Sequence, residues 1–148
     1  MKWWNEYNNI VTLEFPGADL KKLDLNKVVS ELYSNKISVI CAFANSYYPA
    51  NVCYYNSNIL EKHIDLGEKD LLKETNNLCA HYGIKFIPYL ASIWAGKDVY
   101  LKNKNWAQIQ KNGNITQWDE EFNSVAMCFN SEYINYFFKI VDEIVELY

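Results

Sequence analysis

Residues 37–44 read ISVICAFA, a run of apolar and β-branched side chains that is typical of a strand covered on both faces, as in a parallel sheet. A similar run precedes it at residues 10–15, and another follows at residues 84–90. Pro88 interrupts the last run and lacks the N–H that a central strand needs. We therefore expect that strand to end at Ile87 or to bulge at Pro88.

Three amphipathic helices alternate with these strands, because apolar residues recur at three- and four-residue spacing. They cover residues from 24 or 26 to 34, residues 69–82, and residues from 130 or 131 to 148. Asp24 or Asn26 is the expected N-cap of the first helix, and Gly83 the expected end of the second. This alternation predicts one parallel sheet with right-handed crossovers and with its strands as neighbours in chain order.

The connections between these elements differ in length. Those after the second and third strands, residues 45–69 and 91–129, are long and aromatic, whereas those after the first two helices are one or two residues. This asymmetry is typical of a barrel or an open sheet whose active face lies at the strand C-termini. Three strands cannot close a barrel, which needs eight strands and about 250 residues. We therefore expect residues 1–148 to be the N-terminal part of a longer protein.

Composition narrows the class of protein further. The 148 residues suit one domain, half of them are apolar, and the net charge of -4 argues against nucleic acid as a partner. No stretch of about 18 apolar residues exists, so no membrane span is expected, and the N-terminus has no secretory signal pattern. The four cysteines have wide, irregular spacing, which predicts reduced thiols, no metal site and a cytoplasmic location. No nucleotide-binding motif is present, so no cofactor is expected.

Four short motifs resemble one family. They are CYYNSN (residues 53–58), DLLKE (70–74), AHYGIK (80–85) and CFNSEY (128–133), and they occur in the family's order. The chain resembles the N-terminal part of the hypothetical glycosyl hydrolases related to α-L-fucosidases, which are often joined to a β-galactosidase-trimerisation-like domain. The resemblance implies an α/β fold: a partial (β/α)8 TIM barrel of about three βα units with parallel strands, spanning residues 1–148. It also implies a carbohydrate substrate, and it leaves open a homo-oligomer formed through C-terminal domains outside this chain.

Hydrolysis of a glycosidic bond needs two carboxylates, one on each side of the scissile bond. The chain has 18 acidic residues, but few follow a predicted strand, and Glu14 is the best placed of them. The acidic residues 65, 68 and 70 precede a helix, where negative charge is favoured for structural reasons. The sequence therefore assigns no catalytic carboxylate, and whether this chain is itself an enzyme stays open.

Ring-bearing side chains give the stronger signal, because sugars stack their C–H faces on aromatic rings while polar groups hold the hydroxyls. Five candidates lie after the second and third strands: Tyr54, Tyr55, His63, Trp94 and Trp106. Loops after parallel strands emerge at the same sheet edge, so we expect these five to line one substrate cleft. Burial in a local loop core is the competing outcome, expected for at least two of them.

The expected function is thus a glycoside hydrolase barrel fragment that contributes the first strands and part of the carbohydrate cleft. Two alternatives remain: a non-catalytic carbohydrate-binding barrel, and a small standalone α/β binding domain. Acidic residues at the ends of downstream strands would favour the enzyme, whereas cooperative folding of the 148-residue chain would favour the standalone domain. We expect the isolated chain to be marginally stable, because a barrel would cover sheet edges that are open here.

Overall fold

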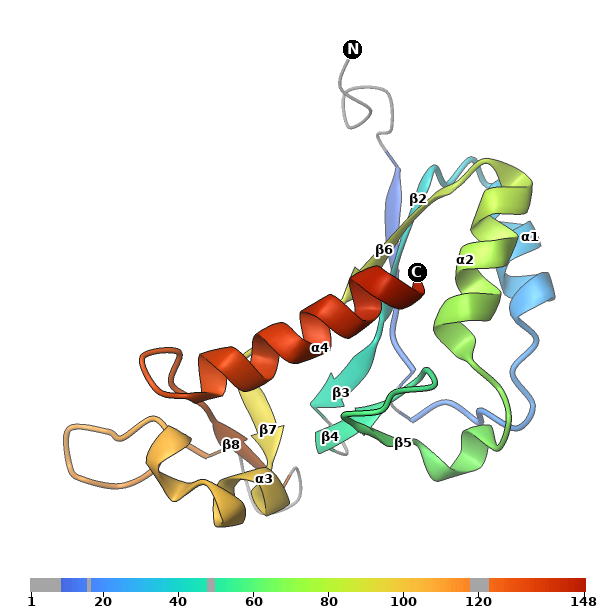
Figure 1. Ribbon diagram of the computed structural model, residues 1–148. Helices are drawn as coiled ribbons and strands as arrows, with labels where there is room; N and C mark the ends of the chain where they lie inside the picture. The colour runs from blue at the N-terminus through green and yellow to red at the C-terminus, as the bar shows by residue number, and fades with distance from the viewer. Residues whose placement is uncertain (1–8, 16, 48–49, 118–122) are drawn as a thin grey trace.

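The computed structural model describes residues 9–15, 17–47, 50–117 and 123–148 (Figure 1). Its centre is a parallel sheet in the order β1-β2-β6. The three strands are β1 (Ile10–Leu13), β2 (Val39–Phe43) and β6 (Lys85–Tyr89). The predicted strand order and direction are confirmed. The N-terminal residues 1–8, in which the sequence shows no secretory signal, lie outside the described residues.

The third strand does not end where the sequence suggested. β6 continues through Pro88, which lies opposite Ala42 in an unbroken register, so the expected end at Ile87 or bulge at Pro88 is wrong. The Lys85 N–H points toward β2 and donates to Ser38 O at 2.9 Å. Because strand N–H groups alternate in direction, the nitrogen of Pro88 faces away from β2. Proline therefore costs this strand no hydrogen bond to β2.

Three helices pack on the sheet, α1 (Leu25–Ser34), α2 (Leu71–Tyr82) and α4 (Tyr133–Leu147). The N-caps of the first two are aspartates: Asp24 accepts from the Lys27 N–H at 3.0 Å, and Asp70 accepts from the Lys73 N–H at 2.9 Å. Gly83 ends α2 in the left-handed region at φ 70°, as its position predicted. In Figure 1, α1 and α2 stand on one side of the sheet and α4 runs across it toward them.

The main core lies between the sheet and these helices. Alternate strand residues such as Val11, Ile40 and Phe86 are paired in register and face this core. Leu71, Leu72, Cys79, Ile140 and Ile144 meet them from the helices. The opposite face of the sheet is more open, since Ile10 is 61% exposed and Tyr89 is 43% exposed.

The two long segments after β2 and β6 are folded, although their elements are too short for periodicity to predict. The first carries β3 (Asn45–Tyr47), β4 (Ala50–Cys53) and β5 (Glu61–Lys62), which form a small sheet of their own. The second carries β7 (Trp94–Gly96), α3 (Lys97–Lys102) and β8 (Ser124–Ala126), with β7 and β8 paired antiparallel. Both groups lie beyond the C-terminal ends of the central strands (Figure 1).

Two further properties follow from the described residues. No helix in these ranges has both the length and the apolar character that crossing a membrane requires. All four cysteines are free thiols, with Cys53 and Cys79 buried and Cys41 and Cys128 partly exposed. Burial raises the pKa of Cys53 and of Cys79 to about 11, so both remain protonated at neutral pH.

Candidate functional site

The C-terminal edge of the central sheet presents an aromatic pair. Phe43 ends β2, Tyr89 ends β6, and their rings stack with centroids 4.5 Å apart and an interplanar angle of 23°. Phe43 is buried, whereas Tyr89 is exposed. Glu14, the acidic residue that follows β1, is also exposed at this end of the sheet. The edge thus combines an apolar ring surface with one carboxylate.

A buried amide joins the two loops that leave this edge. The Asn45 side chain accepts a hydrogen bond from the Ala91 N–H at 2.8 Å and donates one to the Ala91 carbonyl at 3.4 Å. It continues the parallel ladder, in which the Ala44 N–H donates to Tyr89 O at 2.8 Å. Asn45 therefore fixes the separation of the two loops where they begin. Asn45 is a polar residue directly after an apolar strand, and it was not among the site residues that the sequence predicted.

The first two of the five predicted site residues, Tyr54 and Tyr55, lie in the main core with no exposed surface. The Tyr54 ring packs on Phe15 at a centroid distance of 5.0 Å, and burial raises its pKa. The Tyr55 hydroxyl donates to Glu143 Oε2 at 2.9 Å. Neither ring reaches the described surface, because the CYYNSN turn is drawn in under α4. They can shape a binding surface from beneath but do not form it.

Two carboxylates hold this turn. Besides Tyr55, Glu143 accepts from Ser57 Oγ at 2.5 Å and from the Asn58 N–H at 2.6 Å. Asp70 accepts from the Asn56 N–H at 3.1 Å. It also accepts from the Tyr148 hydroxyl at 2.7 Å. The two motifs CYYNSN and DLLKE therefore meet in space and form a structural clamp, which sequence reasoning did not identify.

His63, the third predicted residue, is half-buried beside Tyr54, with ring centroids 5.9 Å apart and an interplanar angle of 19°. Its Nδ1 accepts from the Asp65 N–H at 3.3 Å and so caps a short 3-10 turn. Asp65 in turn pairs with Lys21 at 2.9 Å, and this lysine lowers the pKa of the Asp65 carboxyl. The position of His63 is thus set by local structure, with part of its ring exposed.

The two tryptophans lie in the second long segment, and both are half-buried. Trp94 is on β7, opposite Ala126 of β8. Trp106 ends a 3-10 turn and packs on α4, with centroids 6.0 Å from Tyr133 and 5.7 Å from Tyr136. The structure therefore brings Tyr54 and His63 together, and it places Trp106 in a different hydrophobic cluster.

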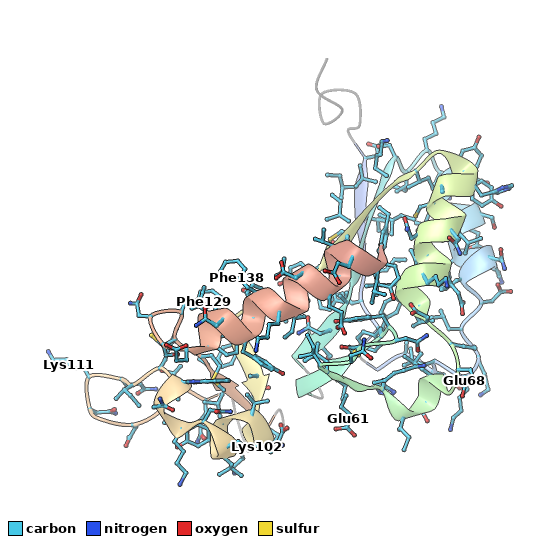
Figure 2. The ribbon with its side chains drawn as sticks, viewed as in Figure 1. Glu61, Glu68, Lys102, Lys111, Phe129 and Phe138 are labelled. Atoms are coloured by element: carbon cyan, nitrogen blue, oxygen red, sulfur yellow. The ribbon has the colours of Figure 1, made fainter. Side chains whose placement is uncertain are left out.

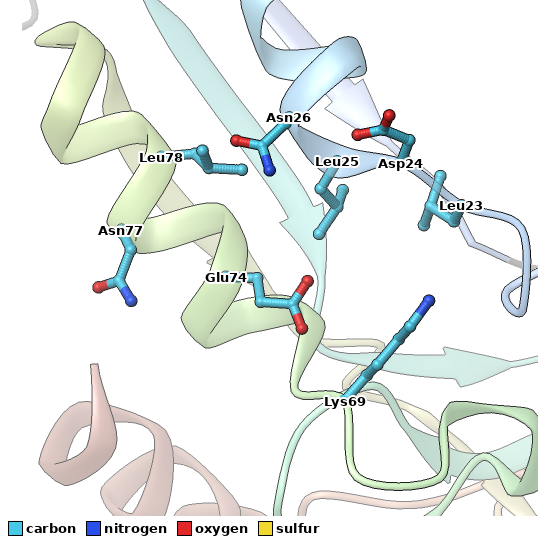
Figure 3. A pocket seen from close by; sticks show the side chains of 8 residues that line it. All are labelled: Leu23, Asp24, Leu25, Asn26, Lys69, Glu74, Asn77 and Leu78. Atoms are coloured by element: carbon cyan, nitrogen blue, oxygen red, sulfur yellow. The ribbon is translucent and has the colours of Figure 1, made fainter.

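The described residues line surface pockets of several kinds. One of about 370 Å³ adjoins Trp106 and is lined by Ile59, Glu61, Asp98, Val99, Lys102, Asn103 and Tyr136. A second of about 490 Å³ lies between α1 and α2 (Figure 3) and has no aromatic side chain in its lining. A third of about 420 Å³ lies at the opposite end of the sheet, by the turns that follow α1 and α2. Within the described ranges, no group of three or more His, Cys, Asp or Glu side chains is arranged to hold a metal ion.

The parallel sheet, the helices on one face and the folded loops at the strand C-termini define a class: α/β proteins with a parallel sheet. In open sheets of that class, the strand C-termini are the usual place for a ligand. The chain belongs to the family described as hypothetical glycosyl hydrolase 6, whose model matches residues 24–148. A search of curated protein sequences finds no match.

Solved glycosidase structures share the fold. Alpha-L-fucosidase isoenzyme 2 from Paenibacillus thiaminolyticus aligns over 95% of this chain and 22% of its own, with a TM-score of 0.78 and 18% identity. The maltogenic alpha-amylase AmyB from Thermotoga neapolitana aligns over 94% of this chain and 36% of its own, with a TM-score of 0.62 and 18% identity. The GH36 alpha-galactosidase AgaB from Geobacillus stearothermophilus aligns over 94% and 19%, with a TM-score of 0.62 and 10% identity. The chain thus spans about a fifth to a third of these proteins.

Proposed function

We propose that this chain forms the first three βα units of a (β/α)8 glycoside hydrolase barrel and one wall of its carbohydrate cleft. The observation that carries the proposal is the arrangement of the central sheet. Three parallel strands in chain order carry their helices on one face and their long, folded loops at one edge. Family membership over residues 24–148 supports the hydrolase class.

The open surfaces of the sheet support the barrel. In a barrel, inward residues are covered by the other strands and no strand edge is left unpaired. On this chain Ile10 and Tyr89 are exposed on the face away from the core, and the outer edge of β6 has no partner among the described strands. Further βα units would cover both surfaces. We accordingly expect the isolated chain to self-associate, which light scattering over a range of protein concentrations measures.

Substrate contact in this proposal belongs to the exposed parts of His63 and Trp94, and Tyr54 and Tyr55 support the loop from beneath. Trp106 lies apart from them in the second hydrophobic cluster. A catalytic pair needs carboxylates roughly 5–5.5 Å apart for retention or about 6.5–9.5 Å apart for inversion. Among the first residues after the three central strands, only Glu14 is acidic. At most one member of the pair therefore comes from these strand ends, and the chain contributes mainly to binding.

The test is hydrolysis by the complete gene product that contains these residues. We would assay p-nitrophenyl α-L-fucoside, α-D-galactoside and α-D-glucoside, the sugar classes that the names of the structural relatives suggest, with calorimetric binding of the same sugars in parallel. We expect turnover of at least one glycoside, and a loss of turnover when Tyr89→Ala removes the exposed ring at the strand edge. Because Glu14 is the sole acid at these ends, a non-catalytic carbohydrate-binding barrel is the second candidate. Binding without turnover would favour it, and neither binding nor turnover would overturn both.

A further inference from the structure

The pocket beside Trp106 has a composition suited to a sugar. Three parts of the chain form it: the start of β5 with the loop before it, the segment from α3 to the following 3-10 turn, and the N-terminal end of α4. Its volume of about 370 Å³ falls in the range of roughly 300–1,000 Å³ found for small-molecule sites. We propose that this pocket is a saccharide-binding site, separate from the barrel cleft, that holds one pyranose ring against Trp106.

The aromatic wall of the pocket is fixed in place. The backbone N–H of Trp106 donates to the Asn103 carbonyl at 2.9 Å, which closes the 3-10 turn. The indole then rests on Tyr136 at an interplanar angle of 36°. A ring held in this way needs no reordering when a ligand arrives, and preorganisation reduces the entropy cost of binding.

The polar rim can satisfy hydroxyl groups, which both donate and accept hydrogen bonds. Glu61 and Asp98 offer acceptors and Lys102 offers donors, and all three side chains are exposed. Among the described residues, none of the three takes part in a side-chain hydrogen bond or an ion pair, so their capacity is available to a ligand. Asp98 and Tyr136 line the same pocket, where burial and then the Asp98 charge raise the pKa of Tyr136.

The other two pockets lack this combination. In the pocket of Figure 3, the Asp24 carboxylate caps α1 and the Lys69 ammonium donates to Leu20 O at 3.3 Å, so two of its three charged groups already serve the fold. The third is Glu74, and that pocket has no aromatic wall on which a sugar could stack. In the third pocket, Tyr33 and Tyr82 pack on each other with centroids 5.0 Å apart, at the sheet end away from the long loops.

The pocket differs in position from the proposed cleft. Its α4 wall includes Tyr136, which packs against the core on the helix-covered side of the sheet. Tyr89 is exposed, and by its register it lies on the opposite face of the sheet, the face of Ile10. An organic cation is the competing ligand for this rim. The two carboxylates and the indole would attract an ammonium group, but the Lys102 ammonium at the same rim opposes one.

The test uses the complete gene product labelled with 5-fluorotryptophan, with the Trp106 resonance assigned from its loss in Trp106→Phe. Methyl glycosides of β-D-glucose, α-D-galactose and α-L-fucose are titrated in turn, with tetramethylammonium as a separate probe. We expect at least one glycoside to shift the Trp106 signal in the millimolar range. Trp106→Leu should weaken that binding at least tenfold, and Glu61→Gln or Lys102→Met should weaken it about threefold to tenfold.

The matched controls are an exposed glutamate and an exposed lysine that carry the same substitutions as the pocket residues. Glu68→Gln and Lys111→Met change exposed side chains that lie far from the pocket on opposite sides of the molecule (Figure 2), and should leave binding unchanged. Turnover of p-nitrophenyl glycosides should be unaltered by the pocket variants, so a failure of the hydrolase proposal does not affect this readout. Equal sugar affinity in wild type and all pocket variants would overturn the inference. Binding of tetramethylammonium in place of sugars, strengthened by Lys102→Met, would also overturn it.

Discussion

Removing the Glu143 carboxylate should destabilise the protein more than removing any exposed acid of the same helix. Glu143 accepts three hydrogen bonds, from Tyr55, Ser57 and the Asn58 N–H, at 2.9, 2.5 and 2.6 Å. A hydrogen bond to a charged group contributes about 1.5–3 kcal/mol, and a buried donor that loses its partner adds a desolvation cost. The three bonds share one carboxylate and are not additive. We therefore expect Glu143→Ala to lower the free energy of unfolding by about 3 kcal/mol, a fall of roughly 6–12 °C in Tm.

The measurement is urea and thermal unfolding followed by circular dichroism, with Glu146→Ala as the matched control. Glu146 lies on the same helix and is exposed, so its loss should change stability by no more than about 0.5 kcal/mol. Tyr55→Phe removes one of the three bonds and should cost about 1 kcal/mol. In a Glu143→Ala background it should cost much less, because the partner is already gone. Equal effects of Glu143→Ala and Glu146→Ala would refute the clamp.

Three further outcomes are expected. Asn45→Ala should cost about 1–3 kcal/mol by leaving the buried Ala91 N–H without its acceptor. Asn45→Asp keeps that acceptor but loses the donor to the Ala91 carbonyl and buries a charge, so it should cost at least as much; unfolding midpoints equal to that of the wild type would contradict this. Burial raises the pKa of Cys79 to about 11, above about 8.5 in the unfolded chain. The contribution of the protonated thiol to the free energy of unfolding is therefore full below about pH 8.5 and is lost as the pH rises toward about 11. Cys79→Ala should remove that part of the loss of stability at high pH, which urea unfolding at a series of pH values measures. Gly83→Ala should cost roughly 1 kcal/mol because φ is 70° at that residue, and an unchanged Tm would show that the turn relaxes.

The central fold was predictable because a strand that is buried on both faces has a continuous run of apolar residues. The apolar run at residues 37–44 and the helix stop at Gly83 each depend on a few neighbouring residues, and the structure has both. The predicted strand end or bulge at Pro88 was wrong because the effect of a proline depends on the direction of its nitrogen. That direction is set by the register with β2, which the sequence does not reveal. The short strands of the two long loops were missed, since elements of two to four residues carry no usable periodicity.

The candidate site was less predictable, because a tyrosine after a strand can face either water or the core. Tyr54 and Tyr55 are buried through their contacts with Phe15 and Glu143, which are distant in the sequence. Trp106 is half-exposed because it lies against Tyr136, and that contact also depends on where α4 packs. Residue type and position alone could not separate the two outcomes.

Two of the motifs that carry the family resemblance are joined by hydrogen bonds in the described chain. Asn56 of CYYNSN donates its N–H to Asp70 of DLLKE, and Asp70 also accepts from the hydroxyl of Tyr148. These contacts tie the loop after β2 to α2 and to the end of α4. That loop then carries Glu61 to the rim of the Trp106 pocket. The buried residues of these two motifs, Tyr54, Tyr55 and Asp70, therefore lie beneath the residues that would contact a ligand. It follows that disruption of the clamp should weaken sugar binding only as far as it also loosens the loop, and variants at the pocket rim should weaken binding with no loss of stability.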